Sequence, residues 1–402
     1  MIILNIILLT LLADSLPVKS PKDVGMTSVQ LNKIKYVVTK GMNYGAFPGA
    51  SVIVGHNGAI VSKIDVGTIN RGASNHTDPL NTIYDLASVT KVVATTAAIM
   101  YLYDRNKILL TDPVQKYLSD FTGKWKDLVT IQQLLTHTSG LPAGRNLSHS
   151  KSIESSKELI VSTKLICKPG ICYNYSDLSM VILGMVIEKI TDTPLDKFVK
   201  DSIFKPLGMN STFYLPPSSM DSRIAPTDVN IGKVSDPISR SLGGVSGNAG
   251  LFSDGNDLAL FSQMMLNKGE LFGVRIYKPE TVELFTTLQT HDRALGWQIC
   301  HGSYGCGGLG TSAYGHTGYT GTSIWIDPKT DTFIIVLTNR LNKPKTSHAE
   351  NIVANIRNDI SDLVEGALDM TTTLPKLRID YLSYQWKRII HKRKKKHDRK
   401  HK

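Results

Sequence analysis

The sequence predicts an α+β fold in which strands from both ends of the chain form one antiparallel sheet flanked by helices. Near the N-terminus, two runs rich in β-branched residues, 51–55 and 59–66, flank an Asn-Gly turn, which is a strong hairpin signal. Near the C-terminus, 322–326 and 332–338 flank an Asp-Pro-Lys-Thr-Asp turn and predict a second hairpin. The chain between these hairpins is mostly helical by its apolar periodicity, so we expect a mainly helical region inserted into the sheet.

Helices are expected where apolar residues recur at three- and four-residue spacing. The first is 28–42, before the N-terminal hairpin, and the last is 347–368, after the C-terminal hairpin. Between them the pattern predicts helices at 92–103, 178–190, 194–204 and 257–267. A cleft is expected where the sheet meets the inserted helical region, since binding sites favour such junctions.

Composition and charge separate one large domain from a basic end. The chain has 402 residues, of which 41% are hydrophobic, and this is enough for a sizeable core. Its net charge is +12, but residues 387–402 contain ten Lys or Arg and one acid, a net +9 that leaves +3 for the rest. The domain should span about 20–368, with sheet parts at about 20–90 and 290–368 and the insert at about 91–289.

The N-terminus has the pattern of a leader. Residues 2–12 are almost wholly apolar, and Ala13-Asp14-Ser15 follows with small residues. A dozen apolar residues are too few to span a bilayer, so we expect a signal peptide at 1–15 and a secreted or envelope-associated protein. A buried N-terminal strand and an uncleaved anchor are the alternatives.

Residues 369–402 are expected to form a linker and a basic tail. Four apolar side chains fall at helical spacing within it: Leu382, Trp386, Ile389 and Ile390. This predicts a short basic amphipathic helix within 382–402 that contacts an anionic membrane surface or the cell envelope. The alternative is a disordered solubilising tail. A nucleic-acid partner is not expected, because that partner conflicts with export.

The four cysteines form two close pairs, Cys167 with Cys172 and Cys300 with Cys306. An even number of cysteines in an exported chain predicts two local disulfides, and free thiols are the alternative. No metal site is expected, because neither pair has the two-residue spacing or the paired histidines of a zinc site. No other cofactor is expected either.

A serine and a lysine three residues apart provide the first chemical signal, in Ser88-Val89-Thr90-Lys91. Positions i and i+3 share one helix face, so the hydroxyl and the amine can meet. The same spacing occurs at 148–151 and 202–205, but only Ser88 precedes a long apolar helical stretch. At a helix N-terminus the partial positive charge favours negative charge that develops on a nucleophile.

Two further segments complete an ordered set. Tyr175-Ser176-Asp177 precedes the predicted helix 178–190, and Gly315-His316-Thr317-Gly318 precedes the C-terminal hairpin. In this order, the three segments resemble the serine penicillin-recognising enzymes: serine β-lactamases, penicillin-binding D,D-peptidases and related esterases. The class C-like branch is most similar, since its middle motif begins with Tyr. The resemblance covers roughly 20–368, is supported by the phrases at 134–142, 242–247 and 318–323, and implies a β-lactamase/transpeptidase-like fold.

The resemblance implies a role for each residue of the catalytic set. Ser88 would attack an acyl carbon and form an acyl-enzyme. Lys91 and Tyr175 would share the removal of its proton. The backbone N–H groups of Ser88 and Tyr319 would form the oxyanion hole.

The resemblance also implies substrate contacts at Asp177, His316, Thr317 and Gly318, and two of these depart from the common pattern. His316 stands where Lys is commoner, and a histidine is only partly charged near neutral pH. This favours esters, amides or D-amino-acid peptides over β-lactams. Asp177 stands where Asn is common, and it either pairs with Lys91 or favours an amine substrate.

The sequence therefore predicts a serine hydrolase that acts on a peptide-like amide or ester, with D-amino-acid peptides as candidates. A true β-lactamase is the alternative within the class. A non-catalytic penicillin-binding or scaffold protein that works through its basic tail is the alternative from another class. His137, in the phrase 134–142, is expected to form a helix-ending turn rather than part of the site.

Overall fold

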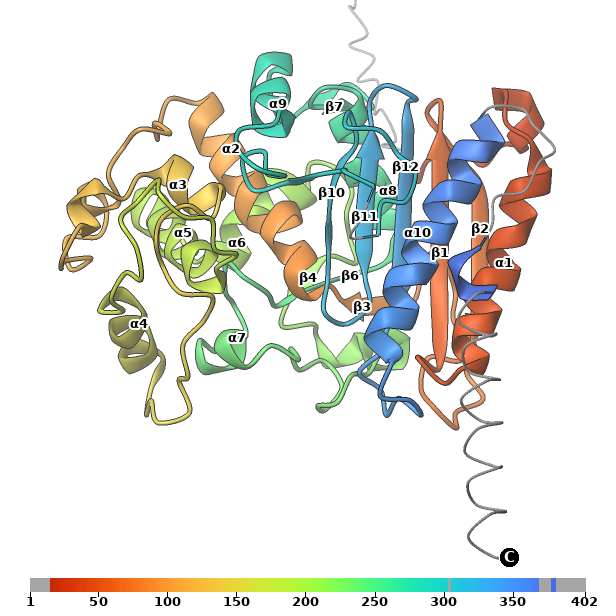
Figure 1. Ribbon diagram of the computed structural model, residues 1–402, viewed down its shortest axis with the longest axis horizontal. Coiled ribbons are helices and arrows are strands. Elements are labelled where there is room, and N and C mark those ends of the chain that lie inside the picture. Colours follow the sequence, from red (N-terminus) through yellow and green to blue (C-terminus); the bar gives the residue numbers. More distant parts are fainter. Residues whose placement is uncertain (1–14, 303–304, 369–376, 381–402) are drawn as a thin grey trace, which may run out of the picture.

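The computed structural model describes residues 15–302, 305–368 and 377–380 (Figure 1). The predicted leader, except for Ser15, and the predicted amphipathic helix in 382–402 lie outside the described residues. Within the described part of the chain, no helix is both long enough and apolar enough to cross a membrane.

The main sheet joins the two ends of the chain, as predicted. Its six strands are ordered β2-β1-β12-β11-β10-β9, and every neighbouring pair is antiparallel. The bounds are β1 Gly49–His56, β2 Ala59–Gly67, β9 Gln298–Ile299, β10 Tyr314–Thr317, β11 Ser323–Asp327 and β12 Thr332–Thr338. Strand β1 pairs with β12 from Ala50 opposite Thr338 to His56 opposite Thr332. Every residue of β1 and β12 is buried, so this pairing forms the centre of the molecule.

Two helices from opposite ends of the sequence pack side by side on the main sheet. Helix α1 (Ser28–Asn43) contacts helix α10 (Ala349–Leu368), and both lie at the same side of the molecule in Figure 1. A Cβ at Gly41 would lie 2.1 Å from Ile356 Cδ1, so the glycine permits the close packing of the two helices. Helix α8 (Gly255–Leu266) packs against β1, β11 and β12.

The inserted region is mainly helical, as predicted, and lies at the opposite side from α1 and α10 (Figure 1). Its α-helices are α2 Ala97–Asp104, α3 Ile131–Leu135, α4 Ile153–Val161, α5 Asp177–Thr191, α6 Leu195–Val199, α7 Pro237–Ser241 and α9 Pro279–Thr286. Short 3-10 turns are present at Pro21–Val24, Ala87–Val89, Val114–Lys116, Lys126–Leu128 and Ser218–Arg223.

Two predicted helices contain a turn that apolar periodicity does not reveal. Lys91–Thr96 has π-helical geometry and continues into α2. Lys200–Phe204 has the same geometry and follows α6. In the first, the Thr95 hydroxyl donates to the Gly247 carbonyl oxygen at 2.7 Å. Such π-turns are rare and occur frequently at functional sites.

A second sheet, absent from the sequence-based prediction, lies beside the start of the helical region. Its strands are β3 Ile83–Asp85, β4 Phe213–Tyr214, β5 Ile224–Ala225 and β6 Leu251–Ser253, in the order β4-β6-β3-β5 with β3 and β5 parallel. A separate hairpin pairs β7 (Glu270–Leu271) with β8 (Val274–Arg275). Strands of two or three residues are too short for a two-residue alternation to be recognised in the sequence.

The four described residues before the basic tail are fastened to α1 and α10. Leu377 and Ile379 are buried in the same core cluster as these helices. The buried Asp359 carboxylate accepts the backbone N–H groups of Arg378 and Ile379 at 2.7 and 2.8 Å. On α1, the Tyr36 hydroxyl donates to Asp380 at 2.8 Å. Residues 377–380 therefore belong to the core of the domain.

This attachment predicts different results for two truncations. A chain that ends after residue 380 should unfold within about 0.5 kcal/mol of the full chain, because it keeps every core contact found among the described residues. A chain that ends after residue 368 should lose about 2–5 kcal/mol of unfolding free energy, because the Leu377 and Ile379 side chains leave the core. Urea unfolding measures both, and equal stability of the two truncations would contradict the packing.

The longer truncated chain also tests the predicted tail. If the basic residues of 381–402 bind an anionic surface, removing them abolishes binding to vesicles that contain phosphatidylserine. Vesicles of neutral lipid are the control. Unchanged binding to the anionic vesicles would rule out the tail as the membrane contact.

Candidate active site

Ser88 lies in a strained turn between strand β3 and the helix that follows. The preceding residue, Ala87, has φ +46°, a left-handed conformation that a residue with a Cβ seldom adopts. The Asp85 carboxylate holds this turn, since it accepts the Ala87 N–H at 2.9 Å and the Ser235 N–H at 2.7 Å. The sequence analysis did not identify Asp85. An Asp two residues before a turn, where it can accept backbone N–H groups, is the signal that could have revealed it.

Lys91 is fully buried and its ammonium contacts three oxygen atoms. Nζ lies 2.9 Å from Ser88 Oγ, 2.9 Å from the Asn248 carbonyl oxygen and 2.7 Å from Asp177 Oδ1. Burial alone would lower the pKa of Lys91, but the Asp177 charge and the interaction with Tyr175 outweigh it and hold this pKa above its ordinary value. Lys91 is therefore a cation at neutral pH, and Asp177 is its partner in an ion pair.

Tyr175 lies among cations and histidines at the start of α5. The Ser176 hydroxyl caps this helix by accepting the Ser179 N–H at 3.2 Å, which places Tyr175 just before the first turn. The Tyr175 ring centroid is 5.2 Å from Lys91 Nζ and 5.3 Å from Arg293 Cζ. Positive charges on two sides favour negative charge on the tyrosine oxygen during a proton transfer.

His137 ends its helix in a turn, as predicted, and also lies against Tyr175. Its φ is +56°, and its ring centroid is 4.7 Å from that of Tyr175. Nδ1 accepts the Ser176 N–H at 3.2 Å. Burial lowers the pKa of His137 well below its usual range, and the charges of Arg293 and Lys91 add to this effect. A neutral, buried His137 thus supports the tyrosine loop.

Strand β10 places His316 and Thr317 beside Tyr175. The His316 and Tyr175 ring centroids are 5.9 Å apart. Burial lowers the pKa of His316 well below its usual range, and the nearby charges of Arg293 and Lys91 act in the same direction. The expected partial positive charge on His316 is therefore absent near neutral pH.

The turn after β10 packs directly against the segment that leads into Ser88. A Cβ at Gly318 would lie 2.4 Å from the Leu86 carbonyl oxygen, so a contact within the protein already requires glycine there. The Thr320 hydroxyl donates to the Asp85 carbonyl oxygen at 2.7 Å, and the Thr322 hydroxyl donates to that of Leu86 at 2.9 Å. These bonds fix Tyr319 relative to Ser88.

Arg357 of α10 holds the same turn from the opposite side. One guanidinium nitrogen donates to the carbonyl oxygens of Gly318 and Thr322, at 2.9 and 2.8 Å. Burial, followed by the charge of Arg340, lowers the pKa of Arg357 to about 9. The C-terminal helix thus supports the segment that carries the predicted oxyanion donor of Tyr319.

A cavity of about 640 Å³ opens over these residues. Its lining includes Ser88, Tyr175 and the residues from His316 to Tyr319, together with Tyr173, Arg293 and Arg340. Lys91 and Asp177 lie next to Ser88 and Tyr175 rather than in this lining. The structure thus brings every sequence-predicted site residue to one place.

Arg293 is the main site residue that the sequence analysis missed. Its side chain is buried, and Nε donates to the Tyr173 hydroxyl oxygen at 2.9 Å. Nη1 is buried and has no hydrogen-bond partner among the described residues. A single arginine in the loop before β9 belongs to no motif, so only the folded chain reveals a positive charge in the cavity.

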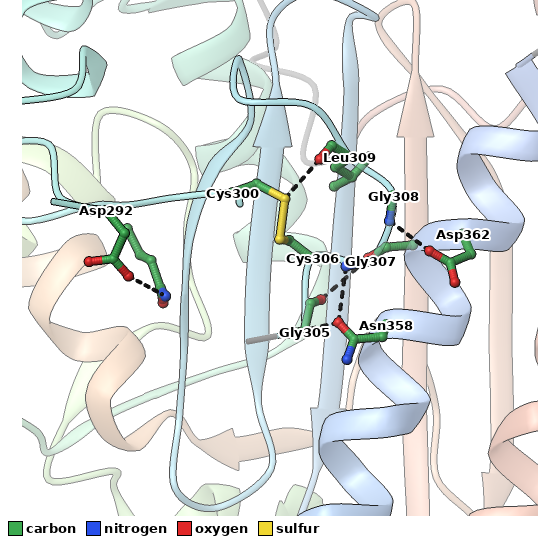
Figure 2. The surroundings of a disulfide bond; sticks show 11 residues. Asp292, Cys300, Gly305, Cys306, Gly307, Gly308, Leu309, Asn358 and Asp362 are labelled. Carbon is green, nitrogen blue, oxygen red and sulfur yellow. Dashed lines mark hydrogen bonds between the residues drawn. A yellow bond between two sulfur atoms is a disulfide. The ribbon is translucent and has the colours of Figure 1, made fainter. Parts of the chain in front are cut away.

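A disulfide fastens the segment that follows the cavity wall (Figure 2). Cys300 is bonded to Cys306, and the residues on both sides of Cys306 are tied to α10. Asn358 accepts the N–H groups of Gly305 and Gly307 at 3.0 Å each, and Asp362 accepts that of Gly308 at 2.6 Å. Next to Cys300, Gln298 of β9 lines the cavity and donates to Asp292 at 3.1 Å.

The other predicted pair, Cys167 and Cys172, is also a disulfide. Gly140 packs tightly there, since a Cβ on it would lie 2.2 Å from the Cys167 carbonyl oxygen. The disulfide of Cys300 and Cys306 is buried. Two disulfides are typical of proteins that fold in an oxidising compartment, which supports the expected export.

Comparisons with known proteins identify the family of the chain. A family model described as β-lactamase matches residues 34–356. A protein of Escherichia coli O157:H7, provisionally named a D-alanyl-D-alanine carboxypeptidase, is 32% identical over 380 residues, which cover 83% of this chain and 87% of the relative. A protein of Salmonella agona with the same provisional name is 34% identical over 402 residues, with 88% and 90% covered.

Solved structures share the fold at lower identity. A penicillin-binding protein homologue from Caulobacter crescentus has a TM-score of 0.70 at 18% identity, with 84% of this chain and 98% of that chain covered. EstCE1, a hydrolase with promiscuous acyltransferase activity, has a TM-score of 0.69 at 20% identity, with 82% and 99% covered. The chain belongs to the β-lactamase family and is an enzyme of the serine hydrolase type.

Proposed function

We propose that this enzyme is a serine carboxypeptidase that removes the last residue of a peptide-like substrate through an acyl-enzyme at Ser88. One observation carries the proposal: Arg293 places a buried guanidinium nitrogen without a partner in the same cavity as Ser88. A buried donor without a partner is costly, and a carboxylate is the group that a guanidinium binds best. The relatives named as D-alanyl-D-alanine carboxypeptidases support a D-amino-acid terminus.

The arrangement accounts for acylation. Ser88 Oγ attacks the scissile carbonyl carbon while its proton passes to the phenolate oxygen of Tyr175, which the Lys91 and Arg293 cations stabilise, and Lys91 stays a cation held by Asp177. The backbone N–H groups of Ser88 and Tyr319 stabilise the negative oxygen of the tetrahedral intermediate. Tyr175 then gives the proton to the leaving amine. Water hydrolyses the resulting ester of Ser88 and releases the shortened peptide.

A lysine cation has a defined use in this scheme. Lys91 Nζ donates to Ser88 Oγ, so the geometry orients the hydroxyl rather than accepting its proton. Its charge also stabilises the Tyr175 phenolate that accepts the proton, because Nζ lies 5.2 Å from the Tyr175 ring centroid. Asp177 keeps the proton on Lys91 while burial acts to remove it.

A β-lactamase remains the second candidate, because Arg293 can bind the carboxylate of a β-lactam as well as that of a peptide. The rate of deacylation separates the two. A β-lactamase hydrolyses its acyl-enzyme quickly, whereas a D,D-peptidase stays acylated by penicillin.

The nucleophile is tested by covalent labelling. Fluorescent penicillin and a fluorophosphonate should label the wild-type protein, and Ser88→Ala should show no label because no oxygen nucleophile remains. Ser246→Ala, in the loop near Lys91, is the matched control and should keep the label. Persistent labelling of Ser88→Ala would overturn the assignment, and no labelling of the wild type would favour a non-catalytic protein.

The carboxylate contact is tested by Arg293→Gln. For peptides that end in a free carboxylate, KM should rise about 10- to 100-fold, which corresponds to the loss of one charge-assisted contact. The wild type and Arg293→Gln should both cleave C-terminally amidated peptides poorly, and KM for these peptides should differ little between the two proteins. Arg275→Gln alters an exposed arginine outside the cavity and should leave KM unchanged for both kinds of peptide. Equal loss on both peptides would argue against the proposed clamp.

The charge state of Lys91 is tested by Asp177→Asn. Without the Asp177 charge, burial lowers the pKa of Lys91, so its proton is lost at lower pH. If the cation is the active form, the alkaline limb of the kcat/KM profile moves to lower pH. A shift of the acidic limb instead would identify neutral Lys91 as the base and would refute the scheme above.

A further inference from the structure

The ring nitrogens of His316 have distinct roles that the backbone dictates. Nδ1 lies 2.8 Å from the Thr317 carbonyl oxygen. A carbonyl oxygen only accepts hydrogen bonds, so Nδ1 must carry the proton. In a neutral ring, Nε2 then has a lone pair and accepts.

The surroundings of His316 keep the ring neutral. The cations Arg293, Lys91 and Arg357 all act on it, and each disfavours a second proton on the imidazole. The Tyr175 ring packs beside it, and burial lowers the pKa of the nearby His137 well below its usual range, so His137 is neutral as well. The ring is 3% exposed, so water does not offset these effects.

Nε2 is thus a buried acceptor in the wall of the cavity that contains Ser88. It has no hydrogen-bond partner among the described residues. Arg293 Nη1 is a buried donor without a partner in the wall of the same cavity. Native proteins rarely leave such atoms unsatisfied, and ligand groups are a common explanation at a binding site.

We propose that His316 Nε2 accepts a hydrogen bond from the N–H of the scissile amide, and so makes the enzyme select secondary amides over esters. The inference rests on the proposed carboxypeptidase function and deepens it. In a C-terminal amino-acid residue, one carbon bears both the N–H and the carboxylate. The neutral acceptor His316 Nε2 matches the N–H, and the Arg293 cation matches the carboxylate.

No proton moves to His316 in this step. Its Nε2 holds the N–H while Ser88 attacks, and the proton that completes the leaving amine comes from Tyr175. An ester has an oxygen at this position, and a β-lactam nitrogen carries no hydrogen. Both would leave Nε2 without a partner and would lose about one hydrogen bond relative to the secondary amide.

A matched pair of substrates tests the proposal: an acyl-D-alanyl-D-alanine peptide and its D-lactate ester, which differ only in NH against O. His316→Leu removes the acceptor, and His316→Gln can restore one through its amide oxygen. In His316→Leu, kcat/KM should fall about tenfold more for the amide than for the ester, the usual size of one hydrogen bond. His316→Gln should recover most of that ratio.

The outcomes separate the possible failures. An equal fall on both substrates in His316→Leu means that the histidine only supports the fold, and the proposal is overturned. Wild-type protein that cleaves neither substrate refutes the carboxypeptidase function instead. Nitrogen NMR of protein labelled with ¹⁵N-histidine gives a check independent of turnover: a protonated Nδ1 with a pyridine-type Nε2 is expected, and the opposite tautomer contradicts the inference.

Discussion

The buried Lys91 ammonium is the charge on which the arrangement of the site depends. Burying a cation costs several kcal/mol unless partners surround it, and here a carboxylate, a carbonyl and a hydroxyl do so. These three partners come from α5, from the loop before β6 and from the turn after β3. One charge therefore holds three separate segments of the chain together beside Ser88.

Around that charge, Ser88 is held in a strained turn by its neighbours rather than by its own conformational preference. The left-handed Ala87 persists because Asp85 accepts its N–H group and because the turn 318–322 bonds to Asp85 and Leu86. Arg357 in turn fixes 318–322 from α10. The donors of the site are therefore oriented before substrate arrives, which is how enzymes stabilise developing charge with little reorganisation.

The sequence predicted what depends on long patterns and on ordered motifs. Strands β1, β2, β11 and β12 are five to nine residues long and rich in β-branched or aromatic residues, and the three motifs follow one another in a set order. It missed features that depend on tertiary contact. Arg293 belongs to no pattern, the strands beside Asp85 are two or three residues long, and the neutral state of His316 follows from burial among distant cations.

The pairing of β1 with β12 also governs when the enzyme can become active. Strand β1 pairs with β12 only when Ala50 lies opposite Thr338. Contacts so distant in the sequence form slowly, because the entropy cost of closing the long loop comes before the contacts stabilise the sheet. Ser88 is synthesised early, yet the turn 318–322 and Arg357 that complete its surroundings are synthesised near the end. A nascent chain thus carries Ser88 before the residues that fix its surroundings exist, and the candidate site is complete only when the whole domain has folded.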